Sequence, residues 1–165
     1  MAFEIPKQIY SGAIKPVTIG KGAKAITLGG ETSYPFYLFE GAMPHKPRIA
    51  MEVWDKDPVE EWAAPCYEAI KDVAKDPVAW AKKCVSVFGA DAVALILVST
   101  DPNGDNAPPE AAAATAKKVA DAIDVPLVVY GTGSVDKDAE VLPAVAEACQ
   151  GQSLFEYHAA TARIP

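Results

Sequence analysis

A short, fully apolar stretch constrains the fold of this chain more than any other segment. Ala92–Val98 contains only Ala, Val, Leu and Ile, and the turn-forming residues Asp101–Gly104 follow it closely. An apolar run of this length between turn signals is typical of a strand that is buried on both faces. Parallel α/β proteins place their ligand sites at the carboxyl ends of such strands. Ser99, Thr100 and Asp101 lie at this end and are therefore candidate binding residues.

Segments on both sides of this strand repeat an alternation of strand and helix. Strands joined by helices require a parallel sheet with right-handed crossovers. Two α/β architectures fit the pattern: an open doubly wound sheet, or part of a (β/α)₈ barrel. Because a complete barrel needs about 250 residues, a chain of 165 residues has room for about half of one. The predicted strands are Arg48–Trp54, Ala92–Val98, Val125–Tyr130 and Ser153–Tyr157, and the predicted helices occupy the second half of Pro58–Lys75, then 76–88, Glu110–Ile123 and Val141–Cys149.

The region before the first predicted strand has a different character. Two β-prone runs, Lys15–Ile19 and Ala25–Leu28, are joined by a Gly-Lys-Gly turn and predict a small antiparallel hairpin. Gly29–Pro47 is rich in Gly, Pro and aromatic residues, so we expect an irregular loop that either caps the core or contacts a partner or a large flat ligand. We therefore divide the chain into an N-terminal hairpin with an aromatic-rich loop, residues 1–47, and a βα-repeat region, residues 48–165, within one domain overall.

Composition narrows the classes of partner. A net charge of −7 argues against nucleic acid or an anionic membrane as the main partner. No segment is as long and apolar as a membrane span, and the first residues lack the features of a signal peptide, so we expect a cytoplasmic protein. Cys66, Cys84 and Cys149 form no Cys-x-x-Cys pair, so we expect buried reduced thiols and no iron–sulfur cluster or zinc site held by this chain alone.

A second group of polar residues follows the strand predicted at Val125–Tyr130. Gly131, Thr132 and Gly133 lie at its carboxyl end, which parallel pairing places at the same edge of the sheet as Ser99–Asp101. Asp55 ends the first predicted strand. Glu52 lies inside that strand and must meet a cation, a hydrogen-bond donor or water, either in a structural ion pair or in a pocket wall.

These residues suit binding better than nucleophilic catalysis. The sequence has no P-loop spacing and no Gly-x-Ser-x-Gly elbow, the glycine fingerprint for dinucleotides is incomplete, and only two histidines are present. We expect no catalytic residue and no metal site. The candidate binding residues are Glu52, Asp55, Ser99, Thr100, Asp101, Gly131, Thr132 and Gly133.

Several segments in fixed order resemble a known family. The set is similar to the small subunit of the corrinoid iron–sulfur protein, also called the delta subunit of the acetyl-CoA decarbonylase/synthase complex. The resemblance covers about Val17 to Gly151. It rests on Gly29–Glu31, Tyr34–Phe36, Phe39–Gly41, Pro47–Asp55, Trp80–Cys84, Gly89–Asp91 and Val125–Gly131.

The resemblance implies a TIM-barrel subunit, of type (β/α)₈, of which this chain holds about the first half. In that family a larger subunit carries the four-iron cluster and a corrinoid-binding domain, and the cobamide lies over the carboxyl ends of the small subunit's strands. The cobalt takes a methyl group from methyltetrahydrofolate through a separate methyltransferase and passes it to acetyl-CoA synthase, in the anaerobic Wood–Ljungdahl pathway of carbon fixation. By this resemblance the chain is a non-catalytic subunit that helps to hold and shield a cobamide.

Two other functions stay open at this stage. One is a TIM-barrel methyltransferase that binds the pterin of methyltetrahydrofolate at Asp55 and Asp101, and the other is an interaction domain without a small ligand. The family's chain is about twice as long, and the resemblance stops at Ser153, which indicates a fragment, an incomplete gene model or one half of a split protein. Because an open half-barrel exposes strand edges and apolar surface, we expect it to need the remaining half, a partner chain or self-association.

Overall fold

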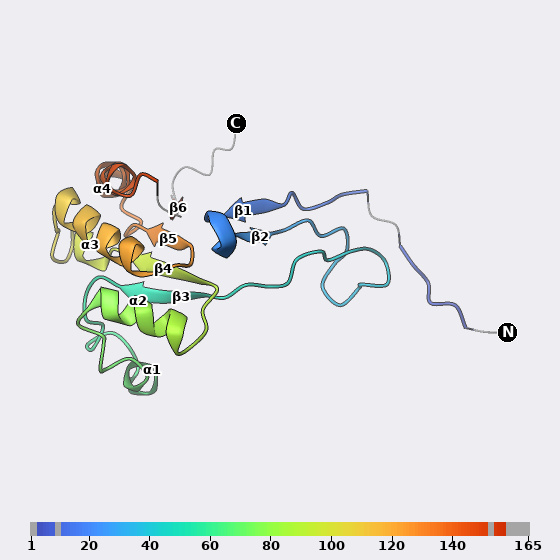
Figure 1. The fold of residues 1–165 in the computed structure, drawn as a ribbon, viewed down its shortest axis with the longest axis horizontal. Helices are drawn as coiled ribbons and strands as arrows, with labels where there is room; N and C mark the ends of the chain where they lie inside the picture. Colours follow the sequence, from blue (N-terminus) through green and yellow to red (C-terminus); the bar gives the residue numbers. More distant parts are fainter. Residues whose placement is uncertain (1–2, 9–10, 152–153, 158–165) are drawn as a thin grey trace.

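Four parallel strands form the central sheet, and they are ordered as they occur in the chain. The structure is a computed structural model that describes residues 3–8, 11–151 and 154–157. Glu52, Ala94 and Val128 lie side by side in the register of the first three strands. The prediction of a parallel sheet is confirmed. The strands are β3 (Ala50–Trp54), β4 (Ala92–Ile96), β5 (Leu127–Tyr130) and β6 (Leu154–Tyr157), as Figure 1 shows.

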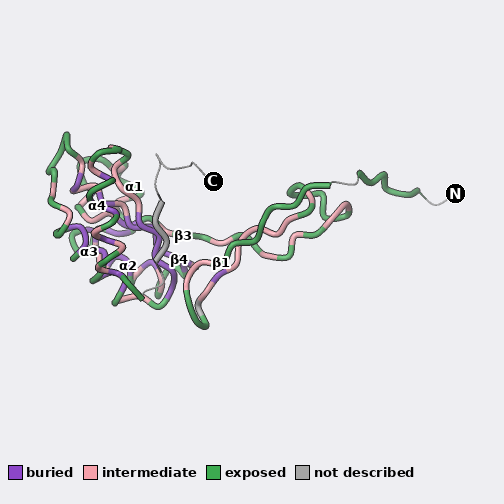
Figure 2. Tube along the Cα trace, turned by 90° about the horizontal axis from the view of Figure 1, so that it is seen from above, coloured by how far each residue is buried: buried purple, intermediate pink, exposed green. Residues whose placement is uncertain are grey.

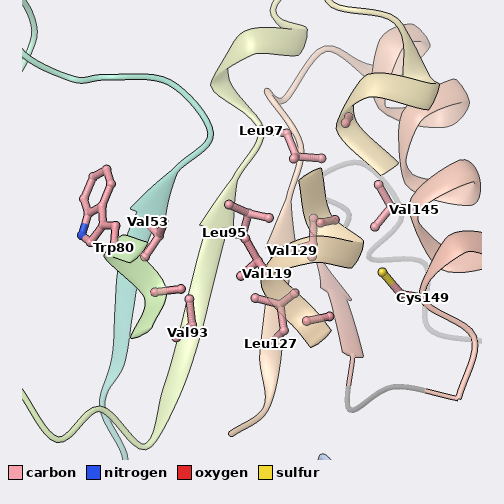
Figure 3. Close-up of a cluster of buried hydrophobic side chains, with 14 of the residues drawn as sticks. Val53, Trp80, Val93, Leu95, Leu97, Val119, Leu127, Val129, Val145 and Cys149 are labelled. Carbon is pink, nitrogen blue, oxygen red and sulfur yellow. The ribbon is translucent and has the colours of Figure 1, made fainter. Parts of the chain in front are cut away.

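Three helices that connect these strands cover one face of the sheet (Figure 1). They are α2 (Pro77–Ser86), α3 (Pro109–Ala122) and α4 (Val135–Ala148). Every second residue of the strands points toward these helices and is almost completely buried. These side chains form the main apolar core together with side chains of the helices (Figure 3). Burial of each such side chain contributes about 1.5–3 kcal/mol. The strand side chains in this core include Val53, Val93, Leu95, Leu127 and Val129, and the helices add Trp80, Val119 and Val145.

The start of α2 follows the sequence prediction closely. The carboxylate of Asp76 accepts hydrogen bonds from the backbone N–H groups of Val78 and Ala79, at 2.9 and 3.3 Å. Pro77 occupies the first helical position, where its missing N–H costs nothing. The helix therefore begins where the Asp-Pro pair predicts.

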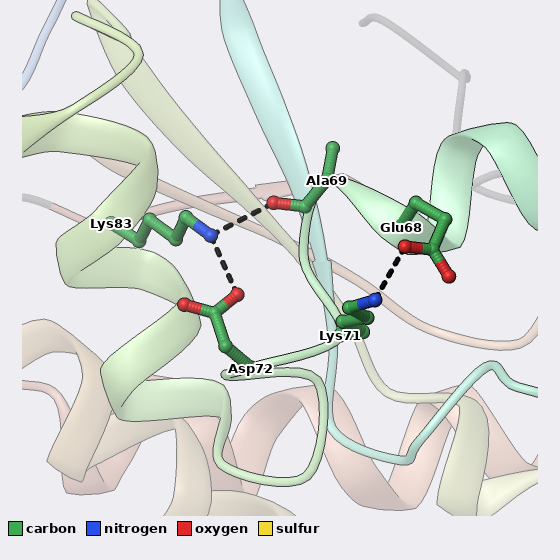
Figure 4. Close-up of polar contacts among 5 residues, drawn as sticks. All are labelled: Glu68, Ala69, Lys71, Asp72 and Lys83. Carbon is green, nitrogen blue, oxygen red and sulfur yellow. Dashed lines mark hydrogen bonds and ion pairs between the residues drawn. The ribbon is translucent and has the colours of Figure 1, made fainter.

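Charged side chains fasten α2 to the turns before it (Figure 4). Lys83 donates to the carbonyl of Ala69 at 2.8 Å and to the carboxylate of Asp72 at 2.6 Å. Lys71 pairs with Glu68 at 2.5 Å at the end of α1 (Ala64–Glu68). The predicted helix in Pro58–Lys75 is thus only five residues long, and residues 69–75 form turns.

The last helix begins earlier than predicted. The sequence places its start at Val141, delayed by Pro143, but α4 begins at Val135 and holds Pro143 in its interior. An interior proline loses one helical hydrogen bond and costs about 3 kcal/mol or more. Complete burial of Val141, Leu142 and Val145 offsets that cost.

The predicted hairpin is confirmed and lies on the sheet face opposite the helices. Its strands β1 (Val17–Ile19) and β2 (Ile26–Leu28) pair antiparallel. A cavity of about 480 Å³ separates it from the sheet. Its apolar walls include Val17, Ile19, Ile26, Leu28, Ala50, Ala92 and Val128.

The sheet is open, and no closed barrel is seen in the described residues. Chain-order strands with helices on one face nevertheless differ from a doubly wound sheet, which has helices on both faces. The α/β class and the hairpin are therefore confirmed, and the described residues form an open parallel sheet.

The structure decides between two expectations for the aromatic-rich loop and corrects one for a cysteine. Of the two alternatives for the loop, capping of the core does not fit, because Tyr34 and Phe36 are 64% and 94% exposed; contact with a partner or a large flat ligand stays a prediction. Figure 2 shows this part of the chain extending away from the helices and the sheet. Cys66 is exposed, while Cys84 and Cys149 are buried as predicted. In the described part of the chain, no helix has the length and apolar character needed to span a membrane.

Candidate functional site

One carboxylate joins the carboxyl ends of the first two strands of the sheet. Asp55 directly follows β3 and accepts hydrogen bonds from the backbone N–H and the hydroxyl of Ser99, at 2.9 and 2.5 Å. Burial raises the pKa of the Asp55 carboxyl above its ordinary value, while the hydrogen bonds from Ser99 act in the opposite direction. Asp55 and Ser99 are therefore brought together, as the parallel arrangement predicts.

Thr100 and Asp101 have different surroundings although they are adjacent. Thr100 is completely buried, and its hydroxyl donates to the carbonyl of Leu97 at 2.8 Å. Asp101 is half-buried, and one of its carboxylate oxygens accepts from the backbone N–H of Asn103 at 2.8 Å. Thr100 thus has a structural role in the turn after β4, whereas Asp101 shapes the polar loop and stays partly accessible.

A third carboxylate, Asp138 in α4, organises the loop after β5. It accepts from the backbone N–H groups of Thr132 and Gly133, both at 2.9 Å, and is only 8% exposed. A Cβ atom on Gly131 would lie 2.2 Å from a carboxylate oxygen of Asp138, so a larger residue at this position would displace that carboxylate from the loop. Gly133 has a left-handed φ of +83°, and a Cβ atom added there would meet nothing within 4 Å, which leaves its backbone open to approach.

Glu52 lies apart from the other candidates. It is exposed on the sheet face opposite the core, beside Ala94 in the register, two residues before β3 ends. The indole N–H of Trp54 donates to its carboxylate. The expected partners of Glu52 are a cation, a hydrogen-bond donor or water. The structure shows the donor, and the described contacts of Glu52 include no cation.

The sequence analysis did not predict two features near the site. Asp138 lies five residues beyond Gly133, and an acidic residue in the first turn of a helix is a common N-terminal feature, so the sequence offers only a weak signal. The second is a row of edge-to-face indoles at the β3 edge. Trp62 contacts Trp54 and Trp80 with ring centroids 5.6 and 5.4 Å apart.

The accessible candidates form a set that we call the strand-end rim: Asp55, Ser99, Asp101, Thr132 and Gly133. It combines carboxylates and hydroxyls at the carboxyl ends of β3, β4 and β5, while the backbone N–H groups of its residues already donate within the chain. This chemistry matches a ligand whose edge carries both hydrogen-bond donors and acceptors. Within the described residues, no three His, Cys, Asp or Glu side chains are grouped so that they could hold a metal ion.

Comparison with known families adds the decisive observation. The family model described as "CO dehydrogenase/acetyl-CoA synthase delta subunit" matches residues 16–163, which is most of the chain. The chain belongs to this family. The match also extends beyond Gly151, so the expectation that the resemblance stops at Ser153 is wrong.

Curated relatives carry the corresponding name, "Acetyl-CoA decarbonylase/synthase complex subunit delta". The protein of Archaeoglobus fulgidus is 40% identical over 161 residues, covering 93% of this chain and 35% of its own length. That of Methanocaldococcus jannaschii is 36% identical over 155 residues, covering 90% and 38%. That of Methanopyrus kandleri is 38% identical over 136 residues, covering 82% and 33%. The chain thus spans about a third of the length of these relatives, not about half as expected.

Proposed function

We propose that this chain forms the part of a delta subunit that helps to hold and shield a cobamide. The cobamide would pass a methyl group between methyltetrahydrofolate and acetyl-CoA synthase, as in the Wood–Ljungdahl pathway. The observation that carries the proposal is the strand-end rim in a member of this family. Parallel strands bring Asp55, Ser99 and Thr132 to one end of the sheet, where α/β proteins bind ligands.

The residues of the rim fit the periphery of a corrinoid. Its amide side chains need both donors and acceptors, and Ser99 and Thr132 supply hydroxyl groups while Asp101 supplies a carboxylate. The open backbone at Gly133 allows a flat ligand to approach without a side chain in the way. When bound, the cobalt supplies the methyl-transfer chemistry, and the protein supplies orientation and exclusion of water.

The proposed division of labour assigns the iron–sulfur cluster and most corrinoid contacts to a larger subunit. This chain contributes three cysteines, and the two buried ones are separated in sequence by 64 residues and lie on different helices or helix ends. We further propose transient contacts with a methyltransferase and with acetyl-CoA synthase. No residue of the rim needs to act as a catalytic acid or base.

We also propose that the sheet is one wall of a (β/α)₈ barrel. The support is the strand order β3-β4-β5-β6 with connecting helices on a single face. The hairpin covers only part of the sheet face opposite the helices, and a cavity lies between the hairpin and that face. Further strands would then continue the sheet from its β6 edge and close the barrel by pairing with β3.

Corrinoid retention tests the proposal. This chain is co-expressed with the larger subunit, and the corrinoid absorption per mole of complex is measured after gel filtration. Asp101→Ala should lower retention at least about fivefold, because a hydrogen bond to a charged group is lost. Lys118→Ala, on the exposed face of α3, is the matched control and should retain the cofactor fully.

Two further measurements sharpen this test. Asp101→Asn keeps an oxygen that accepts from Asn103, so it separates loss of a ligand contact from collapse of the loop. Equal retention in all variants would contradict the assignment of the rim. Methyl transfer from methyltetrahydrofolate by this chain alone would instead favour the pterin-dependent methyltransferase.

A further inference from the structure

The aromatic-rich loop has a defined shape although it contains no helix or strand. We use the name aromatic loop for residues 32–42. Thr32 and Ala42 close its base, because the N–H of Thr32 donates to the carbonyl of Ala42 and the N–H of Ala42 donates to the hydroxyl of Thr32, both at 2.9 Å. A Cβ atom on Gly41 would lie 2.6 Å from the carbonyl oxygen of Thr32. The close approach at the base thus depends on a glycine.

Two successive turns inside this loop direct its large side chains outward. The N–H of Tyr37 donates to the carbonyl of Tyr34 at 3.0 Å, and the N–H of Glu40 donates to the carbonyl of Tyr37 at 2.9 Å. Leu38 and Phe39 are exposed together with Tyr34, Phe36 and Tyr37. The hairpin lies beside the sheet, and the loop extends beyond it, away from the helices and the sheet, in both views (Figures 1 and 2). The loop therefore presents a cluster of apolar surface that its own domain does not cover.

Phe36 has an unfavourable backbone as well as an exposed ring. Its φ is +69°, in the left-handed region that favours glycine, and its side chain is 94% exposed. Strain of this kind persists at sites where it serves binding or function. Among the described residues the Phe36 side chain gains almost no burial that would offset this cost, since its ring is 94% exposed.

Two carboxylates beside the rings each have one oxygen without a hydrogen-bond donor among the described residues. These oxygens, on Glu31 and Glu40, are shielded from solvent, and the same holds for the hydroxyl of Ser33. The other oxygen of Glu40 accepts from the backbone N–H of Gln8 at 3.0 Å. Glu31 and Ser33 line a cleft of about 400 Å³ next to Tyr34. A hydrogen-bond acceptor that is shielded from solvent and has no donor is unfavourable. A lysine or arginine side chain from another molecule would supply the missing donor.

From these observations we propose that the aromatic loop, with Glu31, is a docking surface for another polypeptide. Its partner surface carries an apolar groove for the Phe36 ring and a lysine or arginine that reaches the carboxylates of Glu31 and Glu40. A second copy of this loop is a poor occupant of the surface, because Glu31 and Glu40 of two loops would face each other and residues 31–42 contain no lysine or arginine. The identification of the partner as the larger subunit rests on the proposed function. The existence of the docking surface is independent of that proposal.

Binding of the co-expressed, purified larger subunit tests the proposal directly. Phe36→Gly removes the ring and relieves the strained backbone, so it should fold at least as well while binding about tenfold or more weakly. Glu31→Gln with Glu40→Gln should weaken binding and reduce its dependence on salt. Lys118→Ala, at an exposed position of α3 away from both the loop and the strand-end rim, is the control and should bind like the unmodified chain.

A photoreactive phenylalanine analogue at position 36 identifies what covers the loop. The assembled subunits of the complex are irradiated, and the cross-linked peptide should come from another subunit and contain lysine or arginine. Unchanged affinity of Phe36→Gly, or cross-links only to a second copy or to no protein, would overturn the docking surface. A charge-dependent cross-link to a subunit other than the larger one would keep the surface and contradict the partner named under the proposed function.

Discussion

The carboxylate of Asp55 accepts both the backbone N–H and the hydroxyl of Ser99, so one side chain fixes the end of β4 to the end of β3. The backbone N–H of Asp55 in turn donates to the carbonyl of Ile96 at 3.1 Å. The turn that carries Ser99 and Asp101 is thereby held against the neighbouring strand. The geometry of this turn therefore depends on the Asp55 carboxyl group, whose protonation changes with pH.

The pH dependence of stability should reveal the burial of Asp55. Its pKa in the folded chain is raised above 3.8 by burial, so the folded state binds the proton more tightly than the unfolded state. The contribution of Asp55 to stability is therefore largest below pH 3.8 and declines as pH rises through the folded pKa. The free energy of unfolding, measured by urea titration, should fall over this window relative to Asp55→Asn. If the unmodified chain instead gained free energy of unfolding relative to Asp55→Asn as pH rises, the hydrogen bonds from Ser99 would outweigh burial in setting the pKa of Asp55.

Asp91 should show the opposite pH dependence. Its carboxylate accepts from the guanidinium of Arg48 at 2.7 Å and from the backbone N–H of Ile49 at 3.1 Å, and these contacts hold its pKa below the ordinary 3.8. Its stabilising contribution is present above pH 3.8 and is lost as pH falls through the folded pKa. Relative to Asp91→Asn, the unmodified chain should gain stability as pH rises through that range. Equal slopes in the same urea titration would exclude the ion pair.

Gly131→Ala should destabilise the fold by about 1–3 kcal/mol through overlap with Asp138. The new Cβ would lie 2.2 Å from a carboxylate oxygen, so the clamp on the loop after β5 must open. Thermal unfolding measures the loss. Gly12→Ala is the control, since nothing lies within 4 Å of its Cβ position.

A double variant separates this clash from a general effect of alanine. Gly131→Ala combined with Asp138→Ala should lose less stability than the sum of the two single changes, because the clash exists only while Asp138 is present. Strict additivity would show that the close approach is not the cause.

Local chemistry explains which elements could be predicted from the sequence. The buried strands and the Asp76 cap depend on neighbours in the chain, so the apolar run of β4 and the Asp-Pro pair were sufficient. Parallel pairing then followed from the alternation with helices, and it correctly joined Asp55 to Ser99. These inferences needed no knowledge of distant contacts.

Errors arose where tertiary contacts decide the outcome. Pro143 suggested a late helix start, but burial of Val141 and Leu142 keeps the helix intact around it. The sequence of the aromatic loop left two alternatives, a cap for the core or contact with a partner or flat ligand, and only the exposure of rings such as Phe36 argues against the cap. A clamp such as Asp138 depends on the distance between a helix and a loop, which residue spacing alone does not give.

Pro143→Ala should stabilise the chain by about 1–3 kcal/mol. Pro143 is exposed within α4, so alanine restores a backbone N–H that can donate to the carbonyl of Ala139 without disturbing the core. The midpoint of urea unfolding should rise accordingly. Glu140→Ala, at a neighbouring exposed position of the same helix, is the control and should change stability by less than about 0.5 kcal/mol. A lower midpoint for Pro143→Ala would show that the proline is needed for the path of the helix.

The isolated chain should self-associate or require a partner. Its described sheet has only β4 and β5 with strand neighbours on both sides, and apolar residues such as Ile49 and Val17 are 66% and 48% exposed. Open strand edges and apolar surface of this kind favour association. Light scattering coupled to gel filtration should therefore give a mass above that of one chain, and this mass should fall on dilution. Addition of the larger subunit should replace the self-associated species with a complex that contains both subunits. A folded monomer that persists at all concentrations would show that the open face is stable in water without a covering polypeptide.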